Sequence, residues 1–124
     1  MPIIAGRALR LSLFLAGCLT SAGAFAHAHL QQPLPAAGSE VEASPQALTL
    51  NFSEGIETQF SGVTLTGPQQ KTITLGKPVR SDSNKAQLTV PVEQALTPGE
   101  YTVDWHVVSV DGHKTKGQYT FTVK

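Results

Sequence analysis

Cysteine and methionine are almost absent from this chain of 124 residues, which contains one of each. Cys18 lies in an N-terminal stretch with the features of a leader, so the rest of the chain has no cysteine. Without cysteine that part can form no disulfide, no thiolate metal site and no cysteine nucleophile. Because Met1 is the only methionine, a site built from several thioether ligands for a soft metal ion is excluded as well.

The chain also lacks a hydrophobic run long enough to cross a bilayer, for which roughly 20 apolar residues are needed. The apolar run at residues 11–19 is short, follows two arginines, and leads through small residues to Ala24-Phe25-Ala26. This order is typical of a cleaved secretory signal peptide. We therefore expect residues 1–26 to be removed and residues 27–124 to form a single domain.

An alternative processing site stays open at Cys18. Leu15-Ala16-Gly17-Cys18 resembles the lipobox of bacterial lipoproteins, in which the cysteine is lipidated and becomes the N-terminus. His27 would then lie inside the chain without a free α-amine. Cleavage after Ala26 fits the small-residue pattern, and the site chemistry described below needs it.

An excess of charge of one sign is lacking too. Nine Lys and Arg balance nine Asp and Glu over the whole chain, and two of the cations, Arg7 and Arg10, belong to the leader. Seven cations against nine anions leave the expected mature chain with a formal charge near −2. No basic stripe or run of like charges is present, which argues against binding to nucleic acid or to an anionic membrane.

The remaining sequence is rich in Thr and Val, is divided by turns containing Gly and Pro, and shows no helical period. Short alternating or β-branched stretches recur about every 8–12 residues, which is typical of an all-β sandwich. We expect strands over residues 47–53, 62–66, 72–75, 86–92, 99–110 and 118–123. The Pro- and Ala-rich stretch 30–44 should run extended, as a short edge strand and a turn.

Apolar residues take every second position in the longest expected strand, at Tyr101, Val103, Trp105 and Val107. Because side chains alternate between the two faces of a strand, these four should face the core while His106 faces solvent. Trp105 is therefore interpreted as a core residue rather than a platform for a substrate. The same alternation predicts further core positions at Leu48, Leu50, Phe52, Tyr119, Phe121 and Val123.

Cleavage after Ala26 would make His27 the first residue of the mature chain. Its α-amine and imidazole can chelate one metal ion in a small ring, and the usual amine pKa of about 7.7–8.0 lets a metal displace the proton near neutral pH. Neutral nitrogen donors suit Cu(II), which also heads the affinity order of the divalent ions. His29 is either a further ligand or a polar surface residue.

A second pair of donors lies in Asp111-Gly112-His113. Asp-Gly is a common hairpin signal, so the tripeptide alone indicates only an exposed turn. The spacing of two residues would also place Asp111 and His113 on one side of an extended segment, where they could share an ion. Together with His27 they supply three nitrogens and one oxygen, a suitable equatorial square for Cu(II).

Glu54 ends one of the expected strands and allows two interpretations. It is either a solvated loop carboxylate or a group that holds the N-terminal amine or a bound water beside the metal. His106 is interpreted as a surface residue. The sequence shows no catalytic triad order, no phosphate-binding loop and no cleft of paired carboxylates, so no catalytic residue is predicted.

Several blocks resemble the CopC family of periplasmic copper-binding proteins, and especially its short enterobacterial form. They are the His27 start after Ala24-x-Ala26, the stretches 51–55 and 59–62, and above all residues 98–113. The resemblance covers the whole expected mature chain and implies an immunoglobulin-like Greek-key β-sandwich or barrel. It also implies a Cu(II) site made by the amine and imidazole of His27, by Asp111 and by His113, with Glu54 as a weak or outer ligand.

The function implied by the resemblance is that of a periplasmic copper carrier or buffer in copper homeostasis or resistance. The usual partner in the family is an inner-membrane protein of the CopD type. Some members carry a Met-rich copper(I) site, for which this chain lacks the methionines. The alternative is an enzyme, because polysaccharide monooxygenases also hold copper through an N-terminal histidine. They are usually larger, with an aromatic substrate face, whereas the few aromatics here fall on core positions. We therefore expect a binding protein, whose oligomeric state the sequence does not fix.

Overall fold

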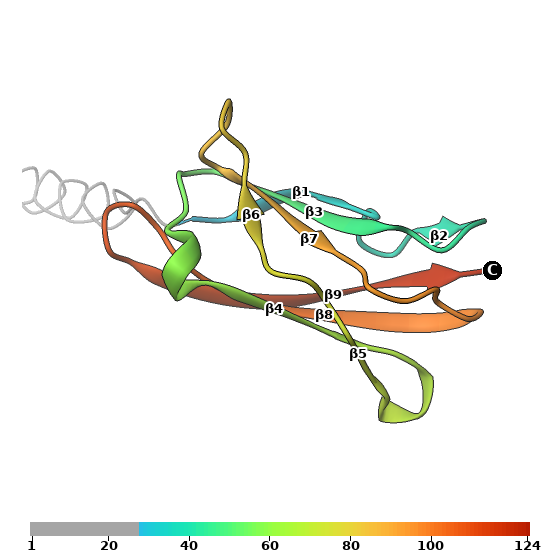
Figure 1. Cartoon of the computed structure of the whole chain (residues 1–124). Helices are drawn as coiled ribbons and strands as arrows, with labels where there is room; N and C mark the ends of the chain where they lie inside the picture. The colour runs from blue at the N-terminus through green and yellow to red at the C-terminus, as the bar shows by residue number, and fades with distance from the viewer. Residues whose placement is uncertain (1–27) are drawn as a thin grey trace, which may run out of the picture.

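Two β-sheets packed face to face make up the fold in the computed structural model, which describes residues 28–124 (Figure 1). The four-stranded sheet contains, in spatial order, β1 (Leu30–Leu34), β3 (Ala47–Phe52), β7 (Gln87–Pro91) and β6 (Val79–Arg80). The five-stranded sheet contains β2 (Glu40–Val41), β9 (Lys114–Val123), β8 (Gly99–Val108), β4 (Gly62–Thr66) and β5 (Thr72–Ile73). Two short 3₁₀ helices, η1 (Thr58–Phe60) and η2 (Pro68–Gln70), lie in the connections.

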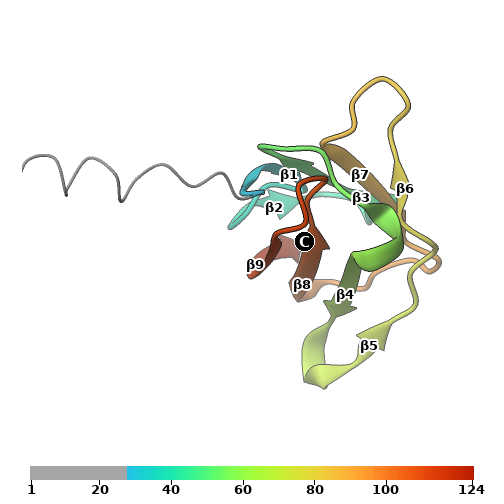
Figure 2. The same cartoon turned by 90° about the vertical axis from the view of Figure 1, so that its left-hand side faces the viewer.

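The chain passes repeatedly between the two sheets, so many neighbouring strands are not consecutive in sequence. β3 pairs with β7 and β4 with β8, both antiparallel, whereas β2 joins β9 in parallel. Figure 2 shows the two sheets as separate layers when the molecule is viewed along the strands. This arrangement confirms the expected all-β sandwich of Greek-key type.

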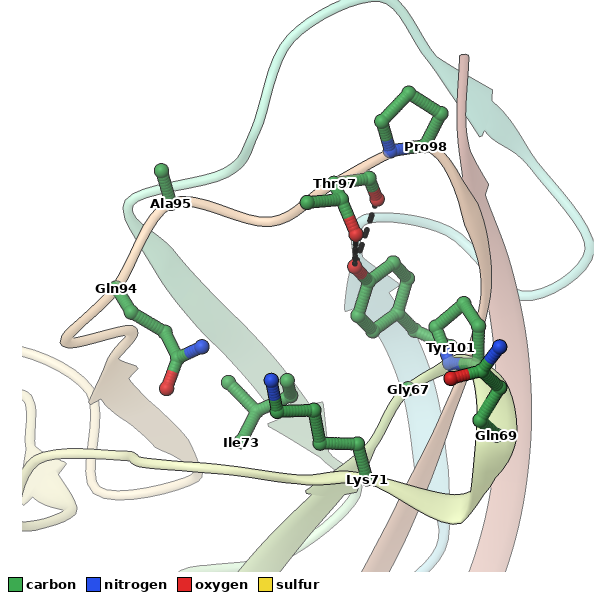
Figure 3. A pocket seen from close by; sticks show the side chains of 10 residues that line it. Gly67, Gln69, Lys71, Ile73, Gln94, Ala95, Thr97, Pro98 and Tyr101 are labelled. Atoms are coloured by element: carbon green, nitrogen blue, oxygen red, sulfur yellow. Dashed lines mark hydrogen bonds between the residues drawn. The ribbon is translucent and has the colours of Figure 1, made fainter.

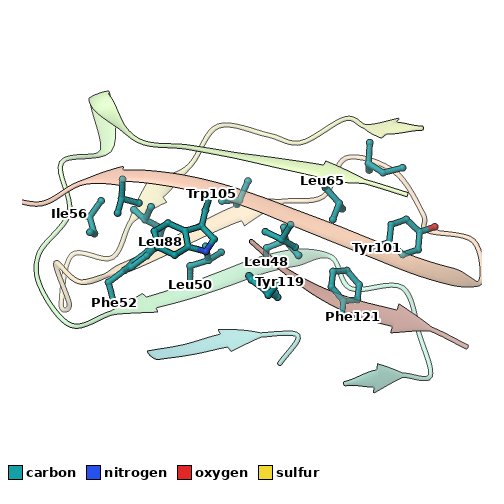
Figure 4. Packing of buried hydrophobic residues seen from close by; sticks show 14 of the residues in the cluster. Leu48, Leu50, Phe52, Ile56, Leu65, Leu88, Tyr101, Trp105, Tyr119 and Phe121 are labelled. Carbon is teal, nitrogen blue, oxygen red and sulfur yellow. The ribbon is translucent and has the colours of Figure 1, made fainter. Parts of the chain in front are cut away.

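The core lies between the sheets and is formed by the alternating residues of the long strands (Figure 4). Phe52 meets Trp105 edge to face at 5.2 Å between ring centroids, and Tyr101 stacks on Phe121 at 5.7 Å. Each fully buried side chain of this size stabilises the fold by roughly 1.5–3 kcal/mol. All the predicted core positions are buried, which confirms Trp105 as a core residue.

Some strand limits differ from those expected. β9 begins at Lys114 rather than at residue 118, because residue-by-residue pairing with β8 continues down to the pair of Val108 with Lys114. β8 correspondingly ends at Val108, before the turn. The two-residue strand β6 was not predicted. The extended stretch after residue 30 is confirmed, with β1 and β2 each at the edge of a sheet.

The turns and connections between the strands lie at the two ends of the sandwich. The start of β1, the β8–β9 turn and η1 lie at one end, on the left of Figure 1, and η2 lies at the other. We call the first the donor end, comprising residues 28–29, 53–56 and 109–115. The second is called the cavity end, comprising residues 67–73 and 94–101. No helix long and apolar enough to span a bilayer occurs among residues 28–124.

Candidate metal centre

The β8–β9 connection is a tight turn closed by backbone hydrogen bonds. The Ser109 N–H donates to the His113 carbonyl at 2.9 Å, and the Gly112 N–H donates to the Ser109 carbonyl at 2.8 Å. Gly112 has a φ of 88°, a backbone conformation that residues with a Cβ seldom adopt. The hairpin turn indicated by Asp-Gly is therefore confirmed, and the alternative of an extended segment through Asp111 and His113 is wrong.

Asp111 and His113 contact each other within this turn. The His113 Nδ1 lies 3.1 Å from the Asp111 Oδ2. The other carboxylate oxygen, Oδ1, accepts a hydrogen bond from the Ser109 hydroxyl and a longer one, at 3.4 Å, from the His113 N–H. These contacts, that of Ser109 first, lower the pKa of Asp111 below its ordinary value of 3.8. The carboxylate is consequently ionised at neutral pH and able to accept a cation.

The first described residues are fixed to the donor end by hydrogen bonds on both sides. Ala28 is 1% exposed, and its carbonyl accepts a hydrogen bond from the Thr115 hydroxyl at 2.9 Å. The His29 N–H donates to the Ser53 Oγ at 2.8 Å, and the Ser53 N–H donates back to the His29 carbonyl at 2.9 Å. The start of this region is thereby held between the segment after β3 and the beginning of β9, two residues beyond His113.

Glu54 lies on the segment that runs beside the turn. The Val110 N–H donates to the Gly55 carbonyl at 2.9 Å, and Ile56 forms an isolated bridge with Ser109. The Glu54 Oε2 is buried and has no hydrogen-bond partner among the described residues. A buried carboxylate oxygen left without a partner is costly, so this position favours a cation or a charged donor.

The structure brings together only part of the predicted site. Asp111 and His113 are adjacent, and the Glu54 segment lies beside their turn. His27 lies outside the described residues, and residues 28–124 by themselves assemble no group of three or more His, Cys, Asp or Glu able to hold a metal. His29 is exposed at the same end. His106 is exposed on the outer face of β8, as expected, with its ring over Gly62.

Ser109 and Thr115 were missed by the sequence reasoning. A single serine or threonine in a strand rich in such residues carries no signal of its own, and only the folded turn shows what the hydroxyl contacts. Ser109 is fully buried and donates to Asp111. Thr115 fixes Ala28.

A separate hollow of about 280 Å³ lies at the cavity end (Figure 3). Its lining includes Lys71, Gln94 and Tyr101, and the Tyr101 hydroxyl donates to the Thr97 carbonyl at 2.7 Å. Figure 3 shows the tyrosine ring directed at Thr97 from the start of β8. The lining contains no His, Asp or Glu, so this hollow offers no set of metal donors.

Comparison with known proteins identifies the family. A model of the CopC domain matches residues 30–124. The chain belongs to the CopC family. Within it, the chain is 55% identical over 119 residues to protein YobA of Escherichia coli (strain K12), a match that covers 95% of this chain and 96% of that relative. It is 39% identical over 119 residues to copper resistance protein C of Pseudomonas syringae pv. tomato, covering 92% and 94% respectively.

Solved CopC-family structures have the same fold. CopC from Methylosinus trichosporium OB3b aligns with a TM-score of 0.73 at 30% identity, covering 79% of this chain and 94% of that one. PcoC, described as a methionine-rich copper resistance protein from Escherichia coli, aligns with a TM-score of 0.72 at 36% identity, covering 80% and 100%. These matches confirm the resemblance and the sandwich predicted from the sequence.

Proposed function

We propose that this CopC-family chain is a periplasmic carrier or buffer that binds one Cu(II) ion at the donor end. Two relatives that match 92% and 82% of the chain are named copper resistance protein C, which supports a role in handling copper. The proposed ligands are the α-amine and imidazole of His27, the Asp111 carboxylate and the His113 imidazole. Three nitrogens and one oxygen in a plane form a coordination set that Cu(II) favours.

The observation that carries the proposal is the fixed position of Ala28 beside the turn. Its carbonyl is bonded to Thr115, two residues from His113. Because His27 directly precedes Ala28 in the sequence, we propose that its amine and imidazole serve the same end. Two ligand-bearing segments that are far apart in sequence would then meet at one ion.

The spacing within the turn also suits a metal. Imidazole nitrogen and carboxylate oxygen bind ions such as Zn²⁺ at about 2 Å, so two such donors at right angles on one ion lie about 2.8 Å apart. The Nδ1 of His113 and the Oδ2 of Asp111 are 3.1 Å apart without the ion. An ion could therefore replace the direct contact between them with only a small movement of the turn.

Glu54 fits the outer position proposed for it. Its buried Oε2 is unpartnered among the described residues and would be stabilised by the N-terminal amine or by a water on the ion. Because the four proposed ligands fill the plane around the ion, the protein would transfer copper by ligand exchange rather than by redox turnover. An inner-membrane protein of the CopD type is the proposed recipient of the copper.

Native mass spectrometry of the protein purified from the periplasm tests this function, with spectra taken before and after one equivalent of Cu(II). The proposal predicts a mass beginning at His27 that retains one copper ion. A lipidated species beginning at Cys18, or a chain beginning at His27 that retains no copper, would contradict it.

A further inference from the structure

Ser109, at 0% exposure, is the one non-aromatic residue with a polar side chain that is buried among residues 28–124. It stands between the end of β8 and the turn that carries Asp111 and His113. Buried hydroxyl groups are retained only where hydrogen bonds compensate their loss of water. The partners of this hydroxyl therefore show what it contributes.

The Ser109 hydroxyl is directed at the two turn residues proposed to bind copper. Its Oγ–H donates to the Asp111 Oδ1. The same Oγ lies 3.3 Å from the His113 N–H, which donates to it, and 3.3 Å from the His113 carbonyl. A serine hydroxyl has one proton and two lone pairs, so donation to the carboxylate still leaves it able to accept from His113.

The backbone of Ser109 connects the same point to the rest of the donor end. Its N–H donates to the His113 carbonyl, and its bridge with Ile56 lies beside the segment of Glu54. These backbone bonds form the turn whatever the side chain at 109. The Ser109 hydroxyl, by contrast, fixes the position of the Asp111 carboxylate.

A hydrogen bond to an ionised carboxylate is about twice as strong as one between neutral groups. Because Ser109 is fully buried, water does not compete at the hydroxyl, and one carboxylate oxygen is held in a single place. The other oxygen, Oδ2, then faces the His113 Nδ1. A ligand held in place before binding loses less conformational freedom when the ion arrives.

We propose that Ser109 is a positioning residue of the metal site, which sets the Asp111 carboxylate for the ion without touching the ion itself. The proposal rests on the proposed function, because it assumes that Asp111 is a copper ligand. It assigns a role to a residue that supplies no donor to the ion.

The substitution Ser109→Ala tests this role, with Ser61→Ala as a matched control. The Ser61 hydroxyl is also partly buried next to β8, where it accepts from the Val108 N–H at 3.1 Å and donates to the Glu57 carbonyl at 2.8 Å. It contacts neither Asp111 nor His113 in any of these bonds. Ser109→Ala should weaken Cu(II) binding by about 10-fold or more, as loss of an outer-shell partner does, whereas Ser61→Ala should leave it unchanged.

A double-mutant cycle separates positioning from a general structural effect. If Ser109 acts through Asp111, then Ser109→Ala should add little to the loss of affinity already caused by Asp111→Asn. The electron paramagnetic resonance spectrum of the Cu(II) complex should also change in Ser109→Ala and remain native in Ser61→Ala. Additive losses of affinity, or a native spectrum in Ser109→Ala, would overturn the proposal.

Two further variants keep the test informative if Ser109→Ala does not fold. Ser109→Thr and Ser109→Val introduce side chains of nearly equal shape, of which only the threonine has a hydroxyl. The Thr variant should therefore bind Cu(II) about 10-fold more tightly than the Val variant. Equal affinities would reject the positioning role.

A wild-type chain that binds no Cu(II) would refute the proposed function instead. Binding weakened by Asp111→Asn but not by Ser109→Ala would refute the role of Ser109 alone.

Discussion

The two ends of the sandwich differ in what they offer a ligand: one has a hollow, and the other has side chains able to bind a metal ion. The cavity end has a hollow of about 280 Å³, but its lining consists of amides, hydroxyls, apolar groups and the single cation Lys71. The donor end instead pairs Asp111 with His113, and the segment of Glu54 runs beside their turn. A metal ion needs donors at about 2 Å rather than volume, so the donor end is the better candidate despite the hollow at the other.

Each end also uses one hydroxyl in a different way. At the cavity end the Tyr101 hydroxyl donates to the Thr97 carbonyl, a backbone group, and so stabilises the start of β8. At the donor end the Ser109 hydroxyl donates to the Asp111 carboxylate, a side chain with chemistry of its own. The first bond should affect stability alone, and the second should affect ligand binding.

The largest expected effect is the loss of Cu(II) binding in His113→Ala. Removal of a ligand should weaken binding by more than the roughly 10–100-fold caused by loss of an outer-shell partner. His106→Ala removes an exposed imidazole outside the site, and Gln94→Ala alters the cavity end, so both should bind as the wild type does. Competition titrations against a chromophoric chelator measure all three, and a loss in either control would break the distinction between the ends.

Tyr101→Phe should have the reverse effect, lowering stability without changing copper affinity. The substitution removes the bond to the Thr97 carbonyl and should lower the free energy of unfolding by about 1 kcal/mol. Urea denaturation of the metal-free protein measures this change. A weaker affinity for Cu(II) in this variant would mean that the two ends are coupled.

The charge of Asp111 should stabilise the metal-free fold in a pH-dependent way. Its pKa is lowered by the Ser109 hydrogen bond and by His113, so folding favours the ionised form. Such a group stabilises the fold above its unfolded-state pKa, and the contribution is lost as pH falls through the lower folded-state pKa. The stability difference between wild type and Asp111→Asn should thus be present at about pH 5 and disappear well below pH 3.8. Denaturation curves over this range would contradict the account if the difference persisted undiminished well below pH 3.8.

The smallest effect is expected for Tyr119→Phe. The Tyr119 hydroxyl is buried without a hydrogen-bond partner among the described residues, and burial raises the pKa of Tyr119 to about 12. Because an unpartnered buried hydroxyl stabilises nothing, its removal should leave the free energy of unfolding unchanged or raise it by about 1 kcal/mol. A loss as large as that in Tyr101→Phe would show that the hydroxyl has a partner.

Periodicity predicted the central strands well because burial decides their pattern. Tyr101, Val103, Trp105 and Val107 alternate as expected and are all buried. The start of β9 was predicted four residues late, since its first residues carry no apolar alternation and are strand only through pairing with β8. The short edge strand β6 likewise depends on its pairing with β7 rather than on its own sequence.

The candidate site could be predicted as residue types but not as geometry. Asp-Gly indicated the hairpin turn correctly, but the contact of Asp111 with His113 was expected only from an extended segment, whereas the turn itself brings them together. Ser109 gave no signal, because its importance depends on a hydroxyl direction that only the folded turn fixes. His27 remains a prediction, because it lies outside the described residues.

The central claim is that the N-terminus and the β8–β9 turn bind one copper ion together. The most direct test compares the mature chain beginning at His27 with the same chain carrying one extra glycine before His27, by Cu(II) competition titration. The account predicts that the added residue, which moves the α-amine away from His27, weakens binding by about 100-fold or more. Equal affinity of the two chains would contradict the claim and leave the turn residues to bind copper without the terminal amine.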